Sequence, residues 1–194
     1  MKRYLLYGLS LLLAACGSSD DKAKEQPILP QGPLSKSANS DTFNLSFGKL
    51  MADYYALKEG FIAEKDSAIA QSARNMMVSV DSLQLKALKA DSNLVATAFT
   101  YTSGISSELK GLLGEKKIDE KRKSFQVVSD QLYDLIRTVR YDQAVIYYDY
   151  CPMAFNDQGA NWLSNTADIR NPYIPKKMIT CGEVKDSIDF RAKQ

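Results

Sequence analysis

The feature that most limits the fold is a pattern of apolar residues spaced three and four positions apart through the middle of the chain. This spacing places the apolar side chains on one face of an amphipathic helix. The pattern restarts near Asp41, Asp66, Asp91 and Ile118, and side chains of the kind found at the first three positions often cap helices. The sequence therefore predicts about four long helices, the last of which ends near Arg140.

Short polar segments separate these predicted helices, which favours antiparallel neighbours. Strands and helices do not alternate as they would around a parallel sheet. We therefore expect an all-α fold, an antiparallel bundle of about four helices. Residues 145–150 are aromatic and β-branched, so they would end the last helix or form a short strand. Proline and glycine recur beyond them, and we expect residues 146–194 to form an irregular Cys/Pro-rich cap on a domain spanning residues 41–194.

The N-terminus has the pattern of a signal peptide, with basic residues at positions 2 and 3 and an apolar run over 4–15. That run is shorter than the ~20 residues of a membrane-spanning helix. It ends in Leu-Ala-Ala-Cys-Gly, which resembles the lipobox of bacterial lipoproteins. We predict cleavage after residue 15 and attachment of acyl chains such as palmitate to Cys16. The alternative is an ordinary signal peptide with a chance cysteine.

Residues 16–40 are rich in serine, charged residues, glycine and proline, which predicts a disordered tether behind the lipidated Cys16. Lipid anchoring would hold the protein on a membrane of the bacterial cell envelope, either on the periplasmic side or on the outer-membrane surface. Cleavage would lower the basic count from 25 to 23, against 23 acidic residues. A neutral chain argues against nucleic acid as a partner, because there is no basic excess to neutralise phosphates.

The predicted cap carries four sulfur-containing residues in two short motifs. Cys151 precedes Met153 by two positions, and Met178 precedes Cys181 by three. Thiolate and thioether ligands favour soft ions, above all Cu(I) and by the same chemistry Ag(I). The chain has no histidine, which makes zinc a weaker candidate and removes the commonest catalytic base. We therefore predict a non-enzymatic metal-binding protein with these four residues as ligands.

A disulfide is the competing interpretation, because a pair of cysteines outside the cytosol typically oxidises. A Cys151–Cys181 bond would leave no cofactor, and the domain would then be a structural or interaction module of the envelope. The aromatic residues Tyr150, Trp162 and Tyr173 would form a shell over a metal site, or they would simply fill the core beneath the cap.

Several motifs of the cap resemble a family of bacterial lipoprotein domains of unknown function, which also occurs fused to the C-terminus of copper and silver efflux membrane-fusion adaptors. The motifs are Tyr-Cys-Pro-Met-Ala at 150–154, Gly-Ala-Asn-Trp-Leu-Ser at 159–164, Ile-Arg-Asn-Pro-Tyr at 169–173 and Met-Ile-Thr-Cys-Gly-Glu-Val-Lys at 178–185. The resemblance implies a link to heavy-metal efflux, with an efflux adaptor or another envelope protein as the partner.

Overall fold

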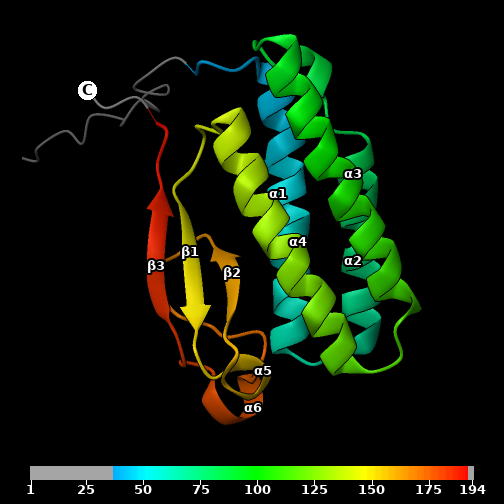
Figure 1. Ribbon diagram of the computed structural model, residues 1–194, viewed down its shortest axis with the longest axis vertical. Helices are drawn as coiled ribbons and strands as arrows, with labels where there is room; N and C mark the ends of the chain where they lie inside the picture. Colours follow the sequence, from blue (N-terminus) through cyan, green and yellow to red (C-terminus); the bar gives the residue numbers. More distant parts are fainter. Residues whose placement is uncertain (1–36, 192–194) are drawn as a thin grey trace, which may run out of the picture. The chain divides into compact units, whose positions relative to one another are not determined.

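The computed structural model describes residues 37–191, and the signal peptide, the lipidated Cys16 and almost all of the tether lie outside this range. Four long helices make up most of it (Figure 1), and a short 3₁₀ turn, η1, lies in the connection between the second and the third. Their bounds are α1 (Asp41–Ile62), α2 (Asp66–Asp81), η1 (Leu85–Ala87), α3 (Ser92–Gly114) and α4 (Ile118–Val139). The predicted number of helices, their starts and the end of the last one near Arg140 are confirmed, whereas α2 ends at Asp81, before the apolar residues at 83, 85 and 88 that continue its pattern in the sequence. No helix within the described range is both long and apolar enough to cross a membrane.

Local sequence explains where the helices begin and end. The Ser40 hydroxyl accepts a hydrogen bond from the Phe43 amide at the start of α1. The Asp91 carboxylate accepts two from the first amides of α3. Side chains of this kind stabilise a helix start because they pair amides that have no partner within the helix. At the end of α4, Arg140 adopts a left-handed conformation, with φ of 51°, which stops the helix.

The apolar faces of the helices meet in one core. Consecutive helices pack on each other, α1 on α2, α2 on α3 and α3 on α4. Their inward residues include the fully buried Phe47, Leu57, Ile105, Leu109 and Phe125. Burying a side chain of this size contributes roughly 1.5–3 kcal/mol, so this apolar face is the main source of the bundle's stability.

The cap contains a small antiparallel sheet, so the expectation of an all-α fold is wrong for this part of the chain. The strands are β1 (Ile146–Cys151), β2 (Ala160–Ser164) and β3 (Glu183–Ile188), in the order β2-β1-β3. The aromatic and β-branched residues of β1 fit the middle of a sheet. The sequence does not predict β3, because five of its six residues are exposed and apolar and polar residues do not alternate along it.

Two short helical turns complete the cap, α5 (Ala154–Asp157) after β1 and α6 (Pro175–Met178) before β3. The sheet lies beside α4, and α5 and α6 lie together at the end of β1 (Figure 1). A buried hydrogen bond joins the sheet to the bundle, since the Leu163 amide of β2 donates to the Tyr54 hydroxyl of α1. The cap is therefore a mostly ordered layer against the bundle, although long loops connect its strands.

Candidate functional site

The fold brings the two cysteines of the cap together. Cys151 is the last residue of β1, and Cys181 lies two residues before β3. Because β1 and β3 are antiparallel, with Tyr150 opposite Glu183, the end of one strand meets the start of the other. The two Sγ atoms are 2.6 Å apart, although 30 positions separate the residues in sequence. Cys151 is buried and Cys181 is half-buried, so one side of the pair faces the surface.

Asn171 holds the loop that carries Cys181 in place. Its side-chain amide donates to the Cys181 carbonyl at 2.8 Å, and its Oδ1 accepts from the amides of Tyr173 and Ile174. Its own backbone amide donates to the Ile179 carbonyl. Sequence reasoning missed this fully buried asparagine. The Asn-Pro dipeptide that begins there is a known turn signal and could have pointed to it.

Gly182 permits the close approach of the two strands beside the cysteines. Its φ of 142° is rare for residues with a side chain, and an added Cβ would lie 2.8 Å from the Trp162 ring and 2.9 Å from the Tyr150 carbonyl oxygen. A larger residue would push β3 away from β1 and separate the sulfurs.

The two methionines lie beside the pair, and both side chains reach the surface. The Met178 carbonyl accepts a hydrogen bond from the Cys181 amide, and the Met153 amide donates one to the Cys181 sulfur. The side chains of Met153 and Met178 are 45% and 39% exposed. The structure thus gathers the backbone of all four sulfur-containing residues at one corner of the cap. Of the four sulfur atoms, the two cysteine sulfurs are in direct contact.

Burial raises the pKa of the Cys181 thiol to about 11, and the neighbouring Cys151 thiol acts in the same direction. At neutral pH this thiol is therefore protonated. A thiolate is the form that binds metals, so a metal ion bound here would displace the proton into solvent.

The segment after Met153 has an unusual backbone. Phe155, Asn156 and Asp157 all have positive φ, at 53°, 57° and 65°. This conformation costs roughly 1–2 kcal/mol for a residue such as Phe155, and less for Asn and Asp, which adopt it more readily. Among the described residues no other run of successive side-chain-bearing residues has positive φ, and Phe155 is the member of this run that the conformation strains most.

The predicted aromatic shell divides into two groups. Trp162 and Tyr173 are buried and pack edge to face, with ring centroids 6.0 Å apart. Tyr150 is half-buried and lies beneath the Lys185 ammonium group, 4.7 Å from its ring centroid. Trp162 meets Gly182, so it packs against the loop of Cys181, and the buried pair also fills the core of the cap. Residues 37–191 contain no group of three or more His, Cys, Asp or Glu side chains that could hold a metal ion.

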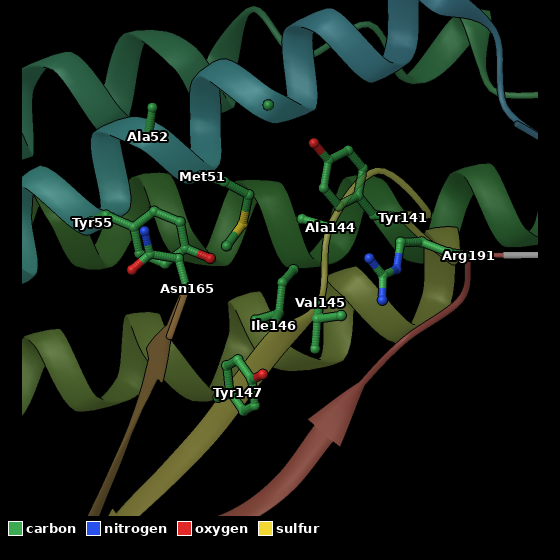
Figure 2. A pocket seen from close by; sticks show the side chains of 11 residues that line it. Met51, Ala52, Tyr55, Tyr141, Ala144, Val145, Ile146, Tyr147, Asn165 and Arg191 are labelled. Atoms are coloured by element: carbon green, nitrogen blue, oxygen red, sulfur yellow. The ribbon is translucent and has the colours of Figure 1, made fainter. Parts of the chain in front are cut away.

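A hollow lies away from the cysteine pair, between α1 and the start of β1 (Figure 2). It has a volume of about 440 Å³, and its walls include Met51, Tyr55, Tyr141 and Ile146, with Arg191 at one side. The four sulfur-containing residues of the cap do not line it. The cysteine pair and this cavity are therefore separate features.

The fold and this site define a helical domain whose small C-terminal sheet positions a pair of adjacent thiols. Residues 50–144 match a family described as "Protein of unknown function (DUF3347)". This match supports the interpretation of residues 50–144 as a domain of unknown function. The match covers most of the bundle and ends before β1, so it does not extend to the cysteines. No curated protein and no solved structure matches the chain.

Proposed function

We propose that the protein is a lipoprotein of the bacterial envelope that binds a soft monovalent metal ion, Cu(I) or Ag(I), at the reduced Cys151–Cys181 pair. The observation that carries this proposal is the contact between the two sulfurs at a surface corner, with Met153 and Met178 exposed beside them. Thiolates and thioethers are the side chains that soft ions select. Anchoring through Cys16 and cooperation with an efflux adaptor or another envelope protein belong to the same proposal.

The two thiolates would supply the charge of the site, and one or both thioethers would complete the coordination. Bonds from a metal to thiolate sulfur are about 2.3 Å long for zinc, so two sulfurs around one ion need more than their present 2.6 Å separation. Two thiol sulfurs with no bond between them also need more than 2.6 Å, so the reduced pair has to open toward the separation that a bound ion requires. We propose a binding role without catalysis for this site, because the chain has no histidine to serve as the commonest catalytic base.

The same geometry favours a second candidate, a structural disulfide. A disulfide bond is about 2.05 Å long, so the pair at 2.6 Å needs only a small shift to close. An oxidising compartment would promote the bond. The domain would then be an interaction module without a cofactor. The reduced pair can bind metal and the oxidised pair cannot, so the redox state decides between the two candidates.

The test is anaerobic titration of the reduced mature chain with Cu(I) in the presence of a competing colorimetric chelator. We expect binding of one ion per chain, loss of binding in Cys151→Ser and weaker binding in Met178→Leu. Met77→Leu, a change on α2, is the matched control and should bind as the wild type does. If the reduced chain does not bind Cu(I), and protein isolated from the envelope has no free thiol at these positions, the disulfide interpretation holds instead.

A further inference from the structure

The two cysteines of the cap differ in how far they reach the surface. Cys151 ends the middle strand of the sheet and has no exposed area. Cys181 is half-buried, and the five residues before it, 176–180, are all exposed. An oxidising compartment favours a disulfide between them, and a thiolate that attacks one of the two sulfurs opens such a bond. The difference in exposure decides which sulfur is attacked.

Exchange between a thiol and a disulfide has a strict geometry. The attacking thiolate lines up with the sulfur–sulfur bond, on the side away from the sulfur that leaves. An attack on Cys181 therefore comes from the side of the residue that reaches the surface. An attack on Cys151 would come from the side of a residue in the core, where an incoming sulfur has no access. Cys181 is therefore the sulfur that is attacked, and Cys151 is the sulfur that leaves.

The contact between the two sulfurs also determines what kind of reductant completes the reaction. After the first attack, Cys181 carries the incoming sulfur, and Cys151 leaves with the electron pair and takes up a proton. The Cys151 thiolate lies beside the new bond and attacks Cys181 again, which expels a reductant that has a single thiol and restores the disulfide. A reductant with two thiols escapes this return, because its second thiol attacks its own first sulfur and releases Cys181 in reduced form.

The surface around the attacked sulfur suits a protein as the dithiol. The side chains of Met153, Met178 and Ile179 are all exposed, and they come from the segments that meet at this corner of the cap (Figure 1). The exposed charges of this corner have both signs, as at Lys177 and Glu183. Apolar contact is therefore the property that a partner here would match, and an exposed apolar surface of this kind is typical of a site of protein interaction.

We propose that a protein with two adjacent thiols and an apolar surface reduces a Cys151–Cys181 disulfide by attacking Cys181, and that this reaction prepares the pair for metal binding. The net change is the transfer of two electrons and two protons from the partner dithiol, which becomes a disulfide, to the cysteine pair. The purpose of this reduction rests on the proposed function, whereas the exchange is a separate reaction with its own measurement.

Glutathione, which has a single thiol, tests which sulfur is attacked. The mature chain is oxidised with diamide, treated briefly with glutathione and quenched with N-ethylmaleimide, and peptide mass spectrometry then locates each adduct. We expect glutathione on Cys181 and maleimide on Cys151 at least about ten times more often than the reverse. In the chain unfolded in urea both sites should be attacked about equally, because burial no longer separates them. Adducts mainly at Cys151, equal adducts in the folded chain, or failure of diamide to form the bond would overturn the proposal.

A thioredoxin and dithiothreitol, a protein dithiol and a small one, test the apolar surface. We expect Ile179→Asn to slow reduction by thioredoxin at least about three-fold and to leave the rate with dithiothreitol unchanged. Leu45→Asn, at an exposed side chain of α1, is the matched control and should slow neither reaction. Equal slowing with both reagents, or no slowing with thioredoxin, would refute this surface as the docking site. Copper titration of the reduced chain is independent of these rates, so a failure of metal binding would leave them unchanged.

Discussion

The bundle and the cap are held together in different ways. In the bundle, successive turns of each helix contribute apolar side chains such as Phe47 and Leu109 to one continuous core. In the cap, strands far apart in sequence are held by the buried polar side chain of Asn171, by Gly182 and by the contact between two cysteines. Apolar side chains of the cap such as Trp162 belong to the same core, so the cap differs from the bundle in adding these few contacts between residues far apart in sequence.

The largest effect should follow from removing a core aromatic residue of the bundle. Phe47→Ala deletes a fully buried ring that stacks on Tyr141 with centroids 4.6 Å apart. Substitutions of this kind typically cost about 3–5 kcal/mol of unfolding free energy. Urea denaturation followed by circular dichroism measures the loss. Phe99→Ala, at a side chain that is 45% exposed, is the control and should cost much less.

Oxidation of Cys151 and Cys181 should stabilise the chain by about 3–4 kcal/mol if chain entropy dominates, because the bond closes a loop of some thirty residues. The measurement compares thermal unfolding with and without reductant. Cys181→Ser should unfold at the same temperature under both conditions. Equal stability of the oxidised and reduced wild type would show that the cap does not depend on this link.

Asn171→Ala should lower the unfolding free energy by about 2 kcal/mol, because it leaves buried backbone groups without partners. Hydrogen exchange compares the local stability of the cap with that of the bundle. Amides around Cys181 should lose protection while those of α3 keep theirs. Uniform loss across both regions would mean that cap and bundle unfold as one unit.

The Glu64 carboxylate joins the two regions, since it pairs with Arg122 of α4 at 2.9 Å and with Lys176 of α6. Hydrogen bonds from Lys176 and Arg122 lower the pKa of Glu64 below its usual range. A lowered pKa stabilises the fold above the unfolded value near 4.3, and this contribution is lost as the pH falls through the folded pKa.

Glu64→Gln should therefore lower stability by about 1 kcal/mol at pH 7 and have progressively less effect as the pH falls below about 4. Denaturation series over this pH range, compared with those of the wild type, measure the difference. A difference that stays constant down to pH 2 would show that the ion pairs are not its source.

The smallest effect concerns backbone strain in the cap. Asp157→Gly removes the side chain at a φ of 65°, which should raise stability by about 0.5–1 kcal/mol. The matched control is Asp168→Gly in the same cap, where φ is not positive, and this change should be neutral or destabilising. If both variants lose stability, the left-handed turn is not strained.

Sequence reasoning succeeded for the bundle because helical periodicity is local. The spacing of residues such as Leu50, Tyr54 and Leu57 records one face of a helix, and capping residues such as Asp91 mark its ends. β3 lacks such a local signal, because apolar and polar residues do not alternate along this exposed strand. Pairing with β1, far away in sequence, makes this segment a strand.

The sequence by itself determined the helices and identified the four sulfur-containing residues, since spacing and side-chain chemistry suffice for both. Only the tertiary structure decided that Cys151 meets Cys181, that Asn171 holds the loop between them, and that the Leu163 amide donates to the Tyr54 hydroxyl. These contacts join β1 to the loop before β3 and α1 to β2, and such long-range neighbours leave no periodic trace in a single sequence.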